Sequence, residues 1–140
     1  MILKVQVIVY CPEPELMFLL LRRGPERGRI WQPVTGKVEP GDADLAAAAA
    51  RELAEETGIE GARLFDTGVE FRFEKDGGTV AERLFRAELD APEPVRLSGE
   101  HVEYAWRDAG EAAVLLDWPI HRTGVDRVRA VVESGGQSTP

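Results

Sequence analysis

The segment between Asp44 and Gly58 constrains the fold more than any other part of the chain. It contains five consecutive alanines, residues 46–50, and alanine has the highest helix propensity of all residues. Asp44 is a favourable N-cap and Gly58 a favourable C-terminal stop, so the segment predicts a helix through about Thr57. Predicted strands surround this helix. The interleaving predicts an α/β fold, a mixed β-sheet between helices, in one domain over residues 1–140.

Apolar side chains at every second position predict most of the strands. A continuous apolar run from Leu16 to Leu21 predicts a strand buried on both faces. The expected strands are 3–9, 16–21, 31–38, 69–73, 85–89 and 102–106. A short helix is expected at 111–116, and valines at helical spacing from Val125 to Val132 predict a final helix. The tail, 134–140, is expected to lack regular structure.

Charge and cysteine content exclude several classes of protein. The 25 acidic and 17 basic residues give a formal net charge of −8, which argues against broad nucleic-acid binding. No apolar run approaches the roughly 20 residues that span a bilayer, and Met1–Lys4 does not begin a secretory signal. Cys11 is the single cysteine, so an internal disulfide and a cysteine-built zinc site are excluded. We therefore expect a soluble cytoplasmic protein without a membrane partner.

Three carboxylates share one surface near the end of the predicted helix. Glu52, Glu55 and Glu56 are three and four positions apart, at the helix end where the macrodipole disfavours anions. Arg51 can pair with Glu55, which leaves Glu52 and Glu56 without a local cation. Hard oxygen ligands in such a cluster suit Mg²⁺ or Mn²⁺. A solvated acidic face has the same spacing, so the spacing alone does not choose between the two interpretations.

The sequence around this cluster resembles the Nudix box. The box runs Gly, five residues, Glu, seven residues, and then Arg-Glu-aliphatic-x-Glu-Glu-x-Gly-aliphatic. Residues 51–59 match every specified position of its second half, and Gly36 stands at the opening glycine. Asp42 replaces the first glutamate, and eight residues separate it from Arg51, which we interpret as a one-residue insertion near Ala43. The chain is therefore similar to Nudix (MutT-like) hydrolases, which implies an α/β/α sandwich.

This resemblance implies metal-dependent hydrolysis of a diphosphate bond. It makes Glu52 and Glu56 the principal ligands of Mg²⁺, or of Mn²⁺, with Glu55 as a third. It also offers the carbonyl of Gly36 as a ligand and has Arg51 orient Glu55. The first acidic position of the box has a structural role in the family, so the replacement there leaves the metal ligands intact.

Members of the family differ in which glutamate is the general base. It is either a glutamate of the box, here Glu52 or Glu55, or one on a distant loop. Glu100, just before the expected strand 102–106, is the candidate on the loop, both as base and as a further metal ligand. Glu103 is the alternative, and an ordinary surface glutamate is the structural interpretation of Glu100.

Two further segments resemble the dihydroneopterin triphosphate pyrophosphatase branch of the family. They are Trp-Gln-Pro-Val-Thr-Gly at 31–36 and Glu-His-Val-Glu-Tyr-Ala-Trp at 100–106. The resemblance implies phosphate contacts from an arginine and a threonine, a histidine beside the metal, and a tryptophan that can stack on a ring. The residues assigned to substrate in this way are Arg22, Trp31, Thr35 and His101.

These residues also have structural interpretations. Arg22 or its neighbour Arg23 can be solvated at a strand end, and His101 can be a surface residue. A tryptophan beside a buried strand, such as Trp31, is commonly part of the core. We assign Trp118 to packing.

Three functions remain open at this point. The first is hydrolysis of dihydroneopterin triphosphate, or of a nucleoside triphosphate, to the monophosphate and pyrophosphate. The second is hydrolysis of a dinucleoside polyphosphate such as diadenosine tetraphosphate. The third is a non-catalytic module that binds a nucleotide metabolite and regulates a partner, which the intact box carboxylates disfavour. We expect a small diphosphate-containing substrate and a monomer or homodimer.

Overall fold

The computed structural model describes residues 1–135, so the expected unstructured tail at 134–140 lies mostly outside the described residues. Within them, seven strands form one sheet. The strands are β1 (Ile2–Cys11), β2 (Met17–Arg23), β3 (Trp31–Gln32), β4 (Val34–Lys37), β5 (Arg63–Lys75), β6 (Gly78–Glu88) and β7 (His101–Arg107). The helices are α1 (Leu45–Thr57), α2 (Ala109–Leu115) and α3 (Pro119–Glu133), with a short 3-10 turn, η1 (Pro25–Arg27). Among residues 1–135, no helix is long and apolar enough to cross a membrane.

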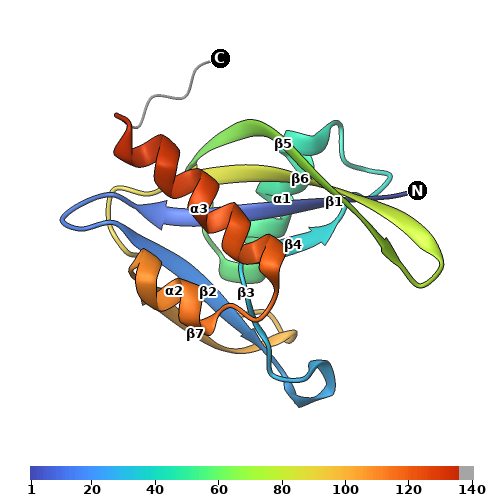
Figure 1. Cartoon of the computed structure of the whole chain (residues 1–140), viewed down its shortest axis with the longest axis horizontal. Coiled ribbons are helices and arrows are strands. Elements are labelled where there is room, and N and C mark those ends of the chain that lie inside the picture. Colours follow the sequence, from blue (N-terminus) through green and yellow to red (C-terminus); the bar gives the residue numbers. More distant parts are fainter. Residues whose placement is uncertain (136–140) are drawn as a thin grey trace.

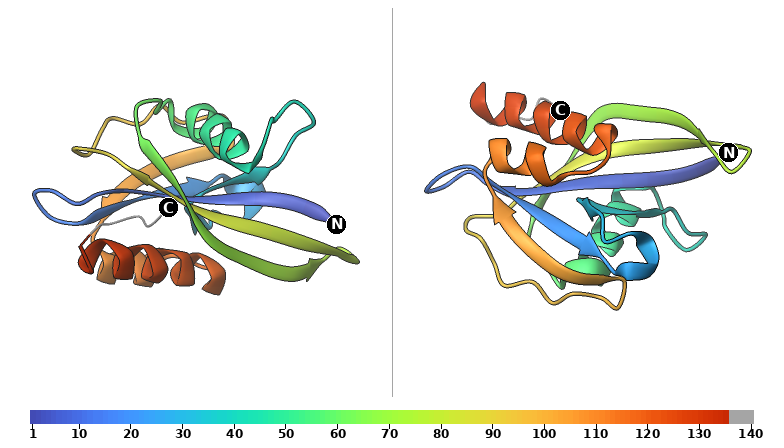
Figure 2. Two further views of the ribbon diagram at one scale, coloured as in Figure 1. Left: turned by 90° about the horizontal axis from the view of Figure 1, so that it is seen from above. Right: turned by 60° about the horizontal axis from the view of Figure 1, so that its bottom comes forward.

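The helices cover both faces of the sheet. α1 lies on one face, and α2 and α3 lie together on the other (Figures 1 and 2). Alternation along β1 explains this arrangement, because Val5, Val7 and Val9 pack on the α1 side while Ile8 and Tyr10 pack on the α3 side. β1 runs parallel to β6 and antiparallel to β2 and β4. The predicted α/β fold with a mixed sheet between helices is confirmed.

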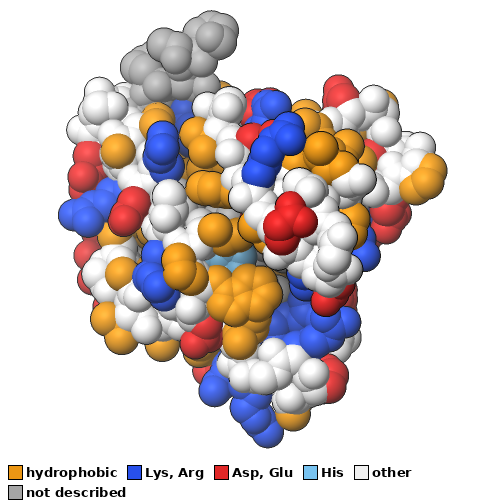
Figure 3. Space-filling view, turned by 45° about the vertical axis from the view of Figure 1, so that its right-hand side comes forward, with side chains coloured by type: hydrophobic (Ala, Val, Ile, Leu, Met, Phe, Trp, Pro, Cys, Tyr) orange, Lys and Arg blue, Asp and Glu red, His pale blue; other side chains and the backbone are white. Residues whose placement is uncertain are grey.

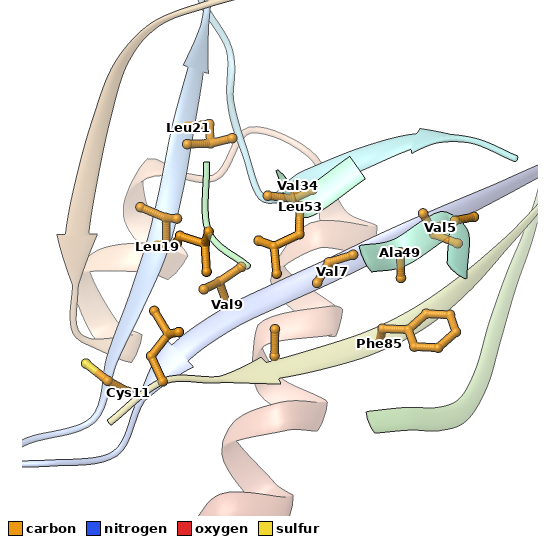
Figure 4. Packing of buried hydrophobic residues seen from close by; sticks show 14 residues of the cluster. Val5, Val7, Val9, Cys11, Leu19, Leu21, Val34, Ala49, Leu53 and Phe85 are labelled. Atoms are coloured by element: carbon orange, nitrogen blue, oxygen red, sulfur yellow. The ribbon is translucent and has the colours of Figure 1, made fainter. Parts of the chain in front are cut away.

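The predicted boundaries of α1 are confirmed, and its alanines have two roles. The Asp44 side chain accepts a hydrogen bond from the Ala47 amide at 2.8 Å, and Gly58 ends the helix with φ of 76°. Only two alanines of the run, Ala48 and Ala49, are buried against the sheet (Figure 4). The others provide helix propensity at exposed or half-buried positions.

The fork at β1 determines where the site lies. Residues 4–7 of β1 pair with β4, whereas Tyr10 and Cys11 at its end pair with β2. β2 then pairs with β3 and β7 instead of following β1. A pocket lies between these branches, and its lining includes residues of β2, β3, β4 and α1.

β5 is longer than the sequence pattern predicts. Alternation predicts a strand at 69–73, but β5 begins at Arg63. Its register with β6 shifts between Asp66 and Glu70, where Gly68 has φ of 78°. This bulge interrupts the alternation, so the first part of the strand is visible only once its partner on β6 is known.

Gly124 gives α3 a close approach to the sheet. An ideal Cβ at this position would lie 2.0 Å from Gln6 Oε1 and 3.3 Å from Leu84 Cδ1. Gln6 is fully buried and donates a hydrogen bond to Glu82 Oε2 at 2.8 Å, so its amide has little freedom to move away.

We expect Gly124→Ala to lower the free energy of unfolding by about 1–3 kcal/mol, the usual cost of overpacking a closed core. Gly110→Ala in α2 is the matched control, because its Cβ would meet nothing closer than 3.6 Å. Urea denaturation of both variants measures the effect. Wild-type stability of Gly124→Ala would mean that α3 has room to shift.

Candidate functional site

Two buried carboxylates from the end of α1 face the pocket at the fork. Glu52 and Glu56, one helical turn apart, both line this pocket of about 630 Å³. Each is less than a tenth exposed. Gly36 on β4 borders the same space and lies directly against Glu52, because an ideal Cβ there would be 1.9 Å from Glu52 Oε2. Only a glycine can therefore stand beside this carboxylate without displacing it.

Arg51 joins the box loop to the helix. Its guanidinium donates to Asp42 with two hydrogen bonds, of 2.8 and 2.9 Å, and to the Lys37 carbonyl at 3.0 Å. It also donates to Glu55 at 3.1 Å, the pairing predicted from the helical spacing, and to Glu52 at 3.3 Å. The hydrogen bonds from Arg51 lower the pKa of Asp42 to about 2. The aspartate at the altered box position therefore closes the longer loop onto the helix.

Glu52 and Glu56 have opposite pKa shifts. Burial raises the pKa of Glu52 to about 7, and the negative charge of Glu56 adds to this effect. Burial also acts to raise the pKa of Glu56, but the hydrogen bonds from His101 and from the Ser98 hydroxyl outweigh it and lower the pKa. At neutral pH the pair therefore shares protons unevenly, with Glu56 the more strongly ionised member.

Glu100 also lines this pocket. Its carboxylate lies 3.7 Å from the guanidinium of Arg23, and its side chain is more than half exposed. The structure thus brings Glu100 to the same space as Glu52 and Glu56, from the loop that precedes β7. Thr35, predicted to contact substrate, lines the pocket as well.

Arg22 and Trp31, predicted to contact substrate, do not line this pocket. The Arg22 guanidinium lies 5.7 Å from the centre of the Trp31 ring and donates to Glu103 at 3.3 Å. Arg23 lines the pocket in its place. The cause is the alternation along β2, which places Arg23 on the same face as Leu19 and Leu21, packed against α1, and Arg22 on the opposite face. Glu103, the alternative base, is accordingly paired with Arg22 outside the lining.

Two further predicted residues, Glu55 and His101, do not line the pocket. Glu55 is exposed and bound to Arg51, and it does not line the pocket. His101 is buried behind Glu56, with its Nδ1 2.7 Å from Glu56 Oε2. It is therefore beside the carboxylate pair, as predicted, but screened from the pocket by Glu56.

The basic side of the pocket was not predicted from the sequence. The chain has only three lysines among its 17 basic residues, and all three line the pocket. With two arginines they surround the carboxylates, on the face of the molecule where basic side chains gather around a hollow (Figure 3). The five cationic residues are Lys4, Arg23, Arg27, Lys37 and Lys75. No local pattern in the sequence marks these lysines, because they come from separate strands.

Trp118 is not a packing residue, contrary to the sequence-based assignment. It is 41% exposed, lines the pocket and stacks on His121 with ring centres 5.3 Å apart. The ammonium of Lys75 lies 6.0 Å from the ring centre. Because the tryptophan precedes α3, the docking of that helix carries it to the pocket.

The donor set fits a magnesium ion that completes its coordination with substrate. Among residues 1–135, no three acidic, histidine or cysteine side chains are assembled closely enough to hold a metal alone. Mg²⁺ commonly uses one or two carboxylates, with water and substrate phosphates as the other ligands. Glu52 and Glu56 provide two carboxylates, and Gly36 lies directly against Glu52.

We expect cation binding to weaken below neutral pH. Burial holds the pKa of Glu52 at about 7, so below that pH a proton must leave this carboxylate before it can bind a metal. Affinity for Mn²⁺, followed by electron paramagnetic resonance of the free ion, should fall by up to about tenfold per pH unit below 7. The Glu52→Gln variant should bind Mn²⁺ more weakly, and its affinity should no longer depend on pH in this range. An affinity that stays constant between about pH 6 and pH 8 would contradict the assignment of Glu52 as a ligand.

Comparisons with known proteins find a matching family model and several similar proteins. The model of the NUDIX domain family matches residues 3–128. The octanoyltransferase of Myxococcus xanthus is 38% identical over a segment that covers 84% of this chain. The same segment covers 33% of the octanoyltransferase, so the chain spans about a third of that relative. The asymmetrical bis(5'-nucleosyl)-tetraphosphatase of Rattus norvegicus is 34% identical over 79% of this chain and 74% of that protein. Among solved structures, the fold is similar to that of the E. coli dihydroneopterin triphosphate pyrophosphohydrolase, with a TM-score of 0.79 and 27% sequence identity. The match covers 89% of this chain and 92% of the E. coli chain.

Proposed function

We propose that this chain, which belongs to the Nudix family, hydrolyses a diphosphate bond in a substrate that carries an aromatic ring and at least three consecutive phosphates. Dihydroneopterin triphosphate and the nucleoside triphosphates are the first candidates, with a monophosphate and pyrophosphate as products. The resemblance to the E. coli pyrophosphohydrolase structure and its branch supports the pterin compound.

The observation that carries this proposal is the presence of five cationic residues in the lining of the pocket that holds the carboxylate pair. Arg23 and Arg27 come from β2 and the turn that follows it, whereas the three lysines come from β1, β4 and β5. An extended chain of phosphates offers oxygens to several cations on separate strands. Arginine supplies paired hydrogen bonds and lysine a point charge, and both suit phosphate.

The position of Trp118 supports the other part of the proposal, an aromatic ring in the substrate. The partly exposed indole of this residue lines the pocket and stacks on His121, with the Lys75 ammonium 6.0 Å from the ring centre. A flat heterocycle can stack there while its phosphates extend toward Glu52 and Glu56.

In the proposed reaction the acidic residues have different roles. When bound, Mg²⁺ neutralises phosphate oxygens and makes a bound water more acidic. Glu52 and Glu56 would hold it, with the Gly36 carbonyl. Glu100 would take the proton of the attacking water on its carboxylate, which the ion pair with Arg23 orients. Glu52 is the second candidate for this step, because a pKa of about 7 suits a base at neutral pH.

Diadenosine tetraphosphate is the second candidate substrate. It is favoured by the identity of 34% with the rat asymmetrical tetraphosphatase. It also has a longer phosphate chain, which all five cations could contact. The Trp118 face would hold one adenine, and the second would extend into solvent.

Product analysis by chromatography, with Mg²⁺ and with an EDTA control, tests the proposal. The panel holds dihydroneopterin triphosphate, the common nucleoside triphosphates, diadenosine tetraphosphate and ADP-ribose. Pyrophosphate release with preference for the pterin supports the first candidate, and preference for diadenosine tetraphosphate selects the second. Preference for ADP-ribose would overturn the requirement for three phosphates. Tight binding without turnover would indicate a non-catalytic module.

Arg23 and Arg22 provide a matched pair of variants. We expect Arg23→Gln to raise KM by about tenfold or more, because a hydrogen bond from a charged group contributes about 1.5–3 kcal/mol. Arg22→Gln removes the same charge from the neighbouring position outside the pocket and should leave KM almost unchanged. Steady-state kinetics on the preferred substrate measures both. Equal effects of the two changes would contradict the placement of Arg23.

A further inference from the structure

One oxygen of Glu56 has two donors from the segment that also carries Glu100. Ser98 Oγ donates to Glu56 Oε2 at 3.1 Å. His101 Nδ1 lies 2.7 Å from the same oxygen, although its N–H does not point straight at it. Because both donors use Oε2, Oε1 is the oxygen available to a cation.

The other side of the His101 ring is held by a residue of the pocket. Gln32 Nε2 lies 3.2 Å from His101 Nε2, and both side chains are buried. A carboxylate only accepts hydrogen bonds, so Nδ1 carries the proton toward Glu56 and the neutral ring accepts at Nε2 from the Gln32 amide. Gln32 therefore donates to His101, and His101 in turn donates to Glu56.

Ser98 connects this row to Glu100. The hydroxyl that donates to Glu56 also accepts a hydrogen bond from the Glu100 amide at 3.3 Å. A carboxylate of α1 and a candidate base before β7, 44 positions apart in the chain, are thus linked through one side chain.

We propose that Ser98, His101 and Gln32 are positioning residues that hold Glu56 with Oε1 directed at the cation. This role rests on the metal site of the proposed function. Ligating carboxylates are commonly held by such hydrogen bonds, and loss of one typically costs about 10–100-fold in metal affinity or activity. The three residues touch Glu56, His101 or Glu100 and act through them.

Mn²⁺ binding without substrate tests the proposal, by electron paramagnetic resonance of the free ion. His101→Leu should weaken binding by about tenfold or more, and Ser98→Ala should weaken it in the same direction. Two conservative changes should recover most of the affinity. Ser98→Thr keeps the hydroxyl, and His101→Asn can place an amide donor close to the position of Nδ1. Tyr104→Phe, on the same strand but exposed, is the control.

Kinetics separate a positioning role from a general loss of structure. The Mg²⁺ concentration for half-maximal rate should rise in His101→Leu, while KM for substrate at saturating Mg²⁺ stays unchanged. Urea denaturation of each variant reports whether it folds. If His101→Leu does not fold, Ser98→Ala still tests the proposal, because it removes only one hydroxyl.

The outcomes distinguish this inference from the proposed function. If the wild-type protein binds no Mn²⁺, the metal site itself is wrong, and the positioning role falls with it. If the wild-type protein binds Mn²⁺ and both His101→Leu and Ser98→Ala bind it equally well, the metal site stands and the positioning role is overturned. Weaker binding restored by Ser98→Thr or His101→Asn supports it.

Discussion

Glu56→Gln should abolish most hydrolysis and leave the fold intact. Charge supplied by a metal and its carboxylates contributes several kcal/mol to the transition state, so kcat/KM should fall by at least about a thousandfold. The glutamine oxygen can still accept from Ser98 and His101, which keeps the buried contacts. Loss of the negative charge also removes repulsion on Glu52. The free energy of unfolding should therefore change little.

Two related variants control this result. Glu60→Gln makes the same chemical change at an exposed position just after α1 and should have wild-type kinetics. Glu55→Gln should cost less than Glu56→Gln, because Glu55 is exposed and paired with Arg51. Steady-state kinetics with Mg²⁺ and urea denaturation measure both quantities. Near-native turnover of Glu56→Gln would mean that the metal assignment is wrong.

Gly36→Ala should inactivate the protein through Glu52. The new Cβ would lie 1.9 Å from Glu52 Oε2 and 2.0 Å from its Cδ, so the carboxylate must leave its position. A carboxyl group at the end of a side chain can rotate away, which preserves the fold. Because a displacement of about 1 Å can cost about a hundredfold in rate, we expect at least that loss in kcat/KM.

Gly41→Ala is the matched control for this change. Gly41 lies in the same box loop, and a Cβ there would meet nothing within 4 Å. Its kinetics and stability should match the wild-type protein. If Gly36→Ala is also fully active, hydrolysis does not require Glu52 where the structure has it.

The sequence by itself determined the elements and the carboxylates. Alanine propensity with Asp44 and Gly58 predicted both ends of α1, because caps and propensities act within a few residues. The spacing of Glu52 and Glu56 placed them on one helical surface, and the structure directs both into one pocket. Alternation predicted most strands, since it depends only on which face of each strand is buried.

Only the tertiary structure decided which other side chains meet those carboxylates. Lys4, Lys75 and Trp118 come from β1, β5 and the start of α3, and only strand pairing and helix docking bring them to one pocket. Alternation puts Arg22 and Arg23 on opposite faces of β2, and only the docking of α1 decides which face meets the carboxylates. The physical reason is the range of the interactions. Local hydrogen bonds and burial patterns depend on residues that are close together in the sequence, whereas a site is formed by contacts between segments far apart in the chain.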